Sequence, residues 1–320
     1  MAIFERKVRK YAGMRIDKYL HVAGLGMSRS QIQKLIEKGC VKVNTKPVKS
    51  NYTLSAGDVI VVEYEKEEPL RVEPEPIPID VVYEDEHVIV VNKPAGMVTH
   101  PAPGHLRGTL INALLYHCKL AESDDKVRPG TVHRLDMDTS GLIMFAKTRE
   151  ALTDLSKQIQ ARRVTRIYRA FVLGNVPLDQ GEIEAPIGRD TIERKRMAVT
   201  PLLSKNAITY YKVLERFKLG DAYISYLELK LGTGRTHQIR VHLAHLGFPV
   251  VGDATYGGRS RPVGFPPDIF NQIMEILKRH ALHAYLLGFT HPVTRKWIEL
   301  ETPLPEDMQK LYELLKKLSI

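Results

Sequence analysis

The sequence predicts an α+β protein with a mainly antiparallel sheet, preceded by a small N-terminal module. Strand-like and helical segments follow one another without the regular βαβ alternation that marks a parallel sheet. Residues 67–80 are rich in proline and glutamate. Proline at this density excludes a helix and favours an extended connector. We therefore predict two domains, residues 1–66 and 81–320, joined by the linker 67–80.

The composition excludes several classes of protein. Of the 320 residues, 43% are hydrophobic, which is enough for a buried core and rules out a chain that is mainly disordered. No apolar run reaches the roughly 18–20 residues that span a bilayer, and the N-terminus lacks the apolar stretch of a signal peptide. Two cysteines, Cys40 and Cys118, cannot form a disulfide framework and fit a reducing compartment. We expect a soluble, cytoplasmic protein.

The charge distribution favours a polyanionic partner. Residues 1–66 carry 13 basic and 6 acidic side chains, and residues 89–320 carry 33 and 23. The intervening residues 67–88 carry 1 basic and 8 acidic side chains, so two basic bodies flank an acidic bridge. Nucleic acid is the simplest partner, because basic side chains release its counterions. A basic surface that is merely solvated has the same composition.

The N-terminal module is predicted to begin with two short helices. Apolar spacing indicates a helix over residues 14–22. Ser28 and Gln31 have the spacing of a capping box and open a second helix. Alternating residues at 41–43 and 58–63 predict strands.

The larger domain mixes strands with helices. The apolar run within residues 87–96 predicts a buried strand that ends in a Lys-Pro-x-Gly turn. Further strands are predicted at 167–173, 209–214 and 223–231. Helices are predicted at 151–160, 236–246 and 305–318.

A first candidate site lies in VHRLDMDTSGLIMF, residues 132–145. Asp136 and Asp138 follow a basic pair and precede a turn that leads into a hydrophobic strand. A carboxylate on a tight loop at the mouth of a strand can act as nucleophile, base or metal ligand. The same residues can also close a turn through local hydrogen bonds. A metal site is disfavoured, because no third carboxylate stands at a recognisable spacing.

A second candidate lies in LKLGTGRTHQIRVHLAHLGFPVVGDATYG, residues 229–257. Two glycines permit a tight turn before Arg235, but the segment matches neither the phosphate-loop nor the dinucleotide-binding pattern. A helix would place the first two of its three histidines about 140° apart, so we expect no zinc site. These histidines are His237, His242 and His245.

Tyr168, in RIYRAFVLG, is the third candidate. On a strand, such a tyrosine is most often a core or interface residue. Its functional alternative is a ring that stacks on a nucleobase.

The N-terminal module resembles an S4 RNA-binding domain over RIDKYL (15–20), MSRSQIQKLIEKGCVKVNTKPV (27–48) and LSAGDVIVV (54–62). Such modules present a helix-rich basic face to structured RNA, so the resemblance implies RNA binding. The alternative is a charged helix face that only keeps the module soluble. The residues that match the RNA-binding face are Arg15, Lys18, Ser28, Arg29, Ser30, Gln31, Lys34, Lys38 and Lys42.

Five segments of the larger domain together resemble the catalytic domain of RluA-type pseudouridine synthases. They occur in order as NKPAG (92–96), HRLDMDTSGL (133–142), IYRAFVLG (167–174), GTGRTHQIRVHLAHLGFPVVGDATYG (232–257) and LHAYLLGFTHP (282–292). With the S4 module, the chain is most similar to the ribosomal large subunit pseudouridine synthase D group. The resemblance implies an α+β fold around a long mixed, mainly antiparallel sheet with a cleft across it.

The family reaction detaches uracil from its ribose at N1 and reattaches it through C5. It involves no net redox change and no hydrolysis, so the resemblance implies neither a cofactor nor a metal. It places the catalytic carboxylate at Asp136. This group could attack the sugar carbon, remove a sugar proton or add to the uracil ring, and the sequence does not choose among the three.

The resemblance also assigns the residues around Asp136. It implies that Arg235 pairs with the carboxylate and that Tyr168 stacks on the flipped uracil. Arg134 would fill the space that the uridine leaves, or else contact a phosphate. Extruding a base from folded RNA costs a few kcal/mol of stacking and pairing.

We therefore predict an enzyme that isomerises uridine to pseudouridine in large-subunit ribosomal RNA. One alternative is the same chemistry on transfer RNA. Another is a non-catalytic S4-type RNA-binding or ribosome-assembly factor, and a nuclease would need metal ligands or paired histidines that the sequence does not assemble. No obligate protein partner and no membrane association are predicted.

Overall fold

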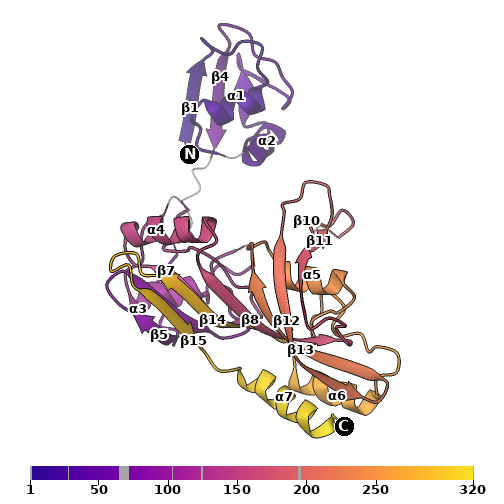
Figure 1. Ribbon diagram of the computed structural model, residues 1–320. Coiled ribbons are helices and arrows are strands. Elements are labelled where there is room, and N and C mark those ends of the chain that lie inside the picture. The colour runs from indigo at the N-terminus through magenta and orange to yellow at the C-terminus, as the bar shows by residue number, and fades with distance from the viewer. Residues whose placement is uncertain are drawn as a thin grey trace. The chain divides into compact units, whose positions relative to one another are not determined.

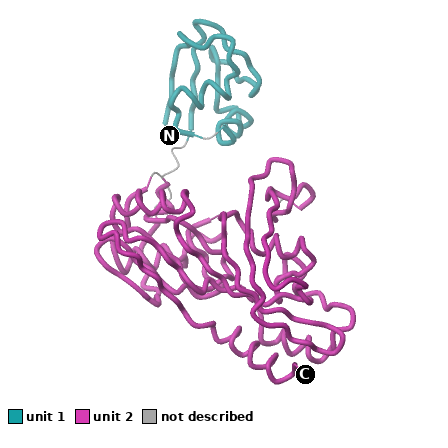
Figure 2. The backbone as a smooth tube through the Cα atoms, in the orientation of Figure 1, with its two compact units in different colours: residues 1–69 teal, residues 70–320 magenta. Residues whose placement is uncertain are grey.

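Two compact units make up the chain, residues 1–69 and residues 70–320 (Figure 2). The computed structural model describes residues 2–27, 29–64, 72–102, 104–123, 125–193 and 196–319. Within these ranges no helix is both long enough and apolar enough to cross a membrane.

The first unit packs two short helices against a small sheet. The sheet order is β1-β4-β2-β3, with antiparallel pairing throughout. The elements are β1 (Ala2–Lys7), α1 (Ile16–Val22), α2 (Arg29–Glu37), β2 (Val41–Val43), β3 (Lys46–Pro47) and β4 (Val59–Tyr64). Both predicted helices and both predicted strands are present, whereas β1 was not predicted. Ser28, the predicted cap of α2, lies outside the described residues.

The predicted linker 67–80 has two parts. Residues 67–71 lie outside the described residues, whereas residues 72–79 run along the second unit without regular secondary structure. Val72 and Ile79 pack against the core of that unit, and the amide of Asn112 donates to the Glu73 carbonyl. The second half of the segment therefore packs against the second unit, because its apolar side chains alternate with its carboxylates.

A long sheet forms the centre of the second unit (Figure 1). Among the described residues it has nine strands in the order β5-β6-β7-β14-β8-β13-β12-β9, with β15 beside β14. Only the β7–β14 pair is parallel among the described strands, so the predicted α+β class with a mainly antiparallel sheet is confirmed. The strands are β5 (Asp80–Glu84), β6 (Val88–Lys93), β7 (Ser140–Ala146), β8 (Thr165–Leu173), β9 (Gln180–Glu184), β12 (Ile208–Leu219), β13 (Ala222–Leu231), β14 (Leu282–Thr290) and β15 (Trp297–Glu301). A separate pair is β10 (Ile187–Arg189) with β11 (Met197–Val199).

Helices cover both faces of this sheet, which explains the continuous apolar run of β6. Val88 and Val90 pack in the cluster that contains Leu155 of α4, whereas Ile89 and Val91 pack with Leu114 of α3. A strand covered on both faces has no polar side to alternate with. The helices are α3 (Leu110–His117), α4 (Arg149–Gln160), α5 (Gln238–His245), α6 (Pro267–Ile276) and α7 (Glu306–Leu318).

Gly141 allows the parallel contact at the centre of the sheet. It lies on β7 opposite Ala284 of β14 and has a φ of +110°. A Cβ atom built there would lie 2.2 Å from the carbonyl oxygen of Ala284, which is backbone and cannot rotate away. This close approach joins β7, which follows the Asp136 loop, to β14, which also pairs with β8 and β15.

We expect Gly141→Ala to destabilise the second unit by about 3 kcal/mol or more, since the two strands must separate. Gly247→Ala is the matched control, because Gly247 also has a positive φ of +85°, but a Cβ atom added there would have no neighbour within 4 Å. Its cost should be about 1 kcal/mol, the strain of the left-handed conformation alone. Urea unfolding of both variants measures the difference, and equal costs would contradict the role of the strand contact.

Candidate active site

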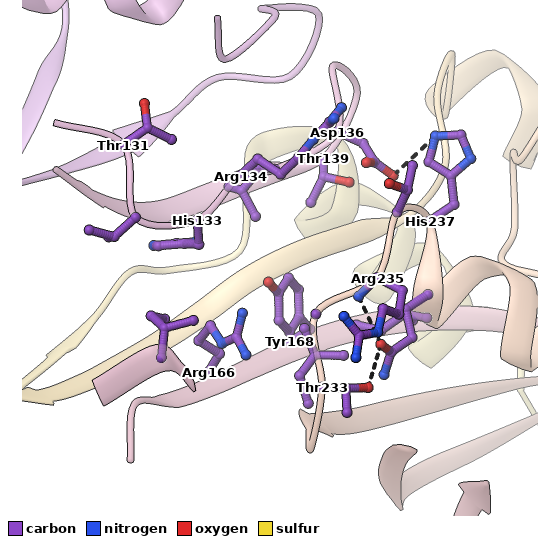
Figure 3. A pocket seen from close by; sticks show the side chains of 18 of the residues that line it. Thr131, His133, Arg134, Asp136, Thr139, Arg166, Tyr168, Thr233, Arg235 and His237 are labelled. Atoms are coloured by element: carbon purple, nitrogen blue, oxygen red, sulfur yellow. Dashed lines mark hydrogen bonds and ion pairs between the residues drawn. The ribbon is translucent and has the colours of Figure 1, made fainter. Parts of the chain in front are cut away.

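A pocket of about 680 Å³ opens beside the centre of the sheet. Among the segments that line it are the loop before β7, the first half of β8, and the loop that leads into α5 (Figure 3). Figure 3 shows Asp136 and Arg134 on the first segment, Tyr168 and Arg166 on the second, and Arg235 on the third. The structure thus brings together segments that are far apart in the sequence.

The loop that carries Asp136 is held through its backbone. Three hydrogen bonds fix it, each from a different segment of the chain. The Thr99 hydroxyl donates to the Leu135 carbonyl at 2.9 Å, Lys93 Nζ to the Met137 carbonyl at 2.9 Å, and Arg279 Nη1 to the Asp138 carbonyl at 3.0 Å. Lys93 is fully buried, and it also donates to the carbonyls of Pro94 and Met97. The Asn-Lys-Pro segment therefore supports the loop.

Arg240 holds the Asp136 carboxylate. Its Nη1 lies 3.1 Å from Asp136 Oδ2, and its Nε and Nη2 lie 2.6 and 2.9 Å from the two oxygens of Asp253. Burial opposes the charge on this arginine, but Asp253 and Asp136 outweigh that effect and raise the pKa of Arg240. One buried guanidinium therefore keeps the Asp136 carboxylate oriented and paired.

The prediction that Arg235 pairs with Asp136 is wrong. Helix α5 begins at Gln238, so Arg235 lies in the preceding loop, where its Nε donates to the Asn206 carbonyl at 3.2 Å. Arg240 lies inside the helix and is 6% exposed. An arginine within an apolar helical segment requires a buried acidic partner, and that requirement was the signal that the sequence offered.

His237 is a second neighbour of Asp136 that sequence reasoning did not assign. Its Nε2 lies 3.8 Å from Asp136 Oδ2, and its Nδ1 lies 2.9 Å from the Tyr256 hydroxyl. The Tyr256 oxygen accepts a hydrogen bond from the Met197 amide. The Tyr256 hydroxyl can therefore donate its own hydrogen bond to His237 Nδ1. Burial lowers the pKa of His237, and the neutral ring can then present Nε2–H to the carboxylate.

Tyr168 and Arg134 both line the pocket that holds Asp136. Tyr168 lies on β8 and is 5% exposed, and burial raises the pKa of its hydroxyl. Tyr168 belongs to the hydrophobic core and also lines the pocket. Its ring can therefore pack in the core and still lie beside a bound substrate. Arg134 is exposed at the opposite wall.

The three histidines of the α5 segment have separate surroundings. His242 is buried, with its Nδ1 at 3.0 Å from Thr209 Oγ1 and its Nε2 at 3.0 Å from the Ala185 carbonyl. Among the described residues, no group of three or more His, Cys, Asp or Glu side chains is placed to hold a metal ion.

In the first unit, most of the predicted RNA-binding residues lie on an exposed surface around α1 and α2. Sequence reasoning missed Asp17, which is fully buried and receives hydrogen bonds from Arg15 and Arg29 at 3.0 and 2.9 Å. Burial opposes its ionisation, but Arg29, Arg15 and Gln33 outweigh that effect and lower the pKa of Asp17 to about 2. The exposed predicted residues are Arg15, Lys18, Arg29, Ser30, Gln31, Lys34 and Lys38, while Lys42 is half-buried.

A paired carboxylate beside an aromatic ring, in a pocket rich in arginine, defines a site for a base-bearing polyanion. Comparison with known proteins agrees with this class. The family model described as RNA pseudouridylate synthase matches residues 87–245, and the S4 domain model matches residues 14–60.

Relatives match nearly the whole chain. The Bacillus subtilis protein named "Uncharacterized RNA pseudouridine synthase YlyB" is 47% identical over 95% of this chain and 94% of its own length. The ribosomal large subunit pseudouridine synthase D of Pseudomonas aeruginosa is 44% identical over 95% and 93%. The solved structure of human RNA pseudouridylate synthase domain containing 1 has a TM-score of 0.53 and 27% identity, covering 76% of this chain and 96% of that one.

The chain therefore belongs to the RNA pseudouridine synthase family. It is an isomerase that converts uridine to pseudouridine.

Arg240→Gln should abolish activity and destabilise the protein by roughly 3–5 kcal/mol, because it leaves two enclosed carboxylates without their cation. Arg235→Gln is the matched control, since it removes the same charge from the same loop–helix segment without touching Asp136. We expect it to cost less than about 1 kcal/mol. Thermal unfolding and pseudouridine formation measure both effects. Equal losses in the two variants would contradict the assignment of Arg240.

Stability of the second unit should fall as the pH drops from about 6.5 towards 4. Burial lowers the pKa of His133 and of His280 to about 3, and that of His100 and of His283 to about 4. Because unfolded histidines bind a proton near pH 6.5 and these folded ones do not, each costs about 1.4 kcal/mol per pH unit in that window.

The first unit supplies an internal control for this pH effect. Its one histidine, His21, is exposed, so the first unit lacks a buried histidine. Hydrogen-exchange mass spectrometry in urea measures the two units separately. Parallel loss in both units would contradict the role of the buried histidines.

Proposed function

We propose that this isomerase modifies specific uridines of large-subunit ribosomal RNA. The main support is the pocket, where Asp136 is paired with Arg240 beside the ring of Tyr168. The Pseudomonas aeruginosa relative, which matches 95% of the chain, is named for action on the large ribosomal subunit. We also propose that the enzyme works in the cytoplasm, which agrees with two free cysteines, Cys40 and Cys118.

The reaction requires an ionised carboxylate in a pocket dry enough to hold a base. Arg240 meets both needs, since a buried cation favours the charged form of a neighbouring acid. Asp136 then acts on the extruded nucleotide by attacking the sugar carbon, by removing a sugar proton or by adding to the uracil ring. Asp136 is also close to His237 Nε2, which can steady the carboxylate oxygen that does not react.

Two further side chains handle the flipped nucleotide. The ring of Tyr168 stacks on the uracil, and its buried hydroxyl can assist removal of the proton from C5. Arg134 is exposed and lies on the wall opposite Tyr168, where it can fill the space that the uridine leaves in the RNA helix. These roles rest on placement in the pocket (Figure 3).

The first unit supplies further contacts to the RNA in this proposal. Its exposed basic residues surround a buried carboxylate, Asp17, that fixes the directions of Arg15 and Arg29. A preorganised pair of arginines loses less freedom on contact with phosphate than two free side chains do. We propose that the S4 unit contributes affinity and that the pocket contributes the chemistry.

Mapping pseudouridines by carbodiimide primer extension tests this function. Unmodified large-subunit ribosomal RNA and transfer RNA are each incubated with the wild-type protein, with Asp136→Asn and with Asp138→Asn. We expect new stops in the ribosomal RNA that vanish with Asp136→Asn. Asp138→Asn is the matched control, because it removes a carboxylate from the same loop whose side chain does not line the pocket, and it should keep its activity.

Other outcomes are equally informative. Stops in transfer RNA alone would contradict the assignment of ribosomal RNA as the substrate and would support the assignment of the enzyme activity. Activity in Asp136→Asn would contradict the role of this carboxylate. Tight RNA binding by the wild type without any stop would contradict the proposed substrate and favour a role in binding only.

A further inference from the structure

Arg166 is a buried cation without a partner. It is 9% exposed, and no described residue accepts a hydrogen bond from its guanidinium or forms an ion pair with it. Its Nε is completely enclosed and has no acceptor. An enclosed and unpaired charge is costly, so such a group calls for an explanation.

Its position is in the active-site pocket. Arg166 lies on β8 two residues before Tyr168, so both side chains are on the same face of the strand, about 6.6 Å apart along it. Both line the same pocket (Figure 3). The guanidinium therefore lies beside the ring that is proposed to stack on the uracil.

Gly234 leaves room at this guanidinium. A Cβ atom at Gly234 would lie 3.1 Å from Arg166 Nη1, although this glycine does not have a positive φ. The second glycine of the Gly-Thr-Gly turn therefore lies close to the guanidinium of Arg166. Its backbone forms part of the pocket wall over the cation.

His133 contributes a second donor without an acceptor. Its Nε2 accepts a hydrogen bond from the Met144 amide, so the proton of the neutral ring is on Nδ1. This Nδ1 is buried and unpartnered, and His133 lines the same pocket. Two unsatisfied donors, one of them charged, therefore line the same pocket.

The carboxylates of the pocket are already paired. Asp136 pairs with Arg240, and Asp125 pairs with Arg128 at 3.3 Å. Among the described pocket residues, none of these acids remains for Arg166. The lining residues therefore leave the charge of Arg166 open to an anionic group of the substrate.

We propose that Arg166, assisted by His133, binds the RNA phosphate adjacent to the flipped uridine. The inference rests on the proposed function, since it takes RNA as the substrate. A phosphodiester supplies two oxygens to the planar fork of a guanidinium and compensates its charge. A uracil carbonyl would offer one neutral acceptor and leave the charge unpaired. By holding the adjacent phosphate, the contact positions the sugar of the target nucleotide, and it does so independently of the RNA sequence.

Phosphate-ethylation interference tests the contact. Large-subunit RNA that the wild-type enzyme modifies is ethylated sparsely and bound by Asp136→Asn, in which the complex accumulates without reaction. Ethylation of a phosphate next to the target uridine should reduce binding. Adding Arg166→Met should abolish this interference at that phosphate only, whereas adding Arg163→Met should not.

Arg163→Met is the matched control, because Arg163 is exposed, carries the same charge and does not line the pocket. Arg166→Met should weaken binding roughly 10- to 100-fold, as expected for a charge-assisted contact. It should also reduce the salt slope by about 0.7 for one phosphate of a single strand. Arg166→Lys should restore the salt slope but not the full affinity.

A structural role for Arg166 predicts a different pattern. Removing a buried and unpaired charge should leave the thermal midpoint of the free protein unchanged or higher, whereas loss of a structural contact would lower it. Interference that persists in Arg166→Met, or equal losses with Arg163→Met, would overturn the proposal. If Arg166→Met does not fold, a single methylphosphonate at the same phosphate must weaken wild-type binding. Failure of the wild type to form pseudouridine in this RNA would instead overturn the proposed function.

Discussion

Arg240 joins the two carboxylates on which the active site depends. Its Nε and Nη2 bind Asp253, and its Nη1 reaches Asp136 in a loop about 100 residues earlier in the chain. The loop around Asp136 has no regular secondary structure, so the pairing with this guanidinium and the donors to the loop backbone hold it in place. The sheet brings the two segments together, and the ion pair sets the direction of the Asp136 carboxylate.

Burial divides the charges of the pocket into two kinds. The histidines around it stay neutral, since burial lowers the pKa of His100 to about 4 and of His133 to about 3. The arginines keep their charge under any physiological condition. Guanidinium groups therefore carry the positive potential of the pocket. Because their charge is constant near neutral pH, this potential does not depend on the protonation of histidines.

Local patterns predicted the elements and failed where the answer depended on tertiary contacts. The apolar runs that became β6 and β13, and the spacing that became α4, are dictated by neighbours in the chain. Neighbours in the chain do not decide whether Arg235 or Arg240 pairs with Asp136, because both arginines belong to one motif. The pairing depends on where α5 begins, at Gln238, and on the distant Asp253. Asp17 and Arg166 were missed for the same reason, since only the folded chain shows which charges are enclosed.

The two buried arginines, Arg240 and Arg166, differ in whether the chain itself supplies their partners. Arg240 must hold its carboxylate in the free enzyme, so its partners belong to the chain and its charge is compensated before substrate arrives. Arg166 has no such partner among the described residues, and its desolvation is a cost that the folded protein already carries. A phosphate that enters the pocket meets a guanidinium that is largely buried and has no carboxylate partner among the described residues, so the contact is stronger than at a solvated arginine. The free energy that destabilises the empty pocket thus becomes affinity for one position of the RNA backbone.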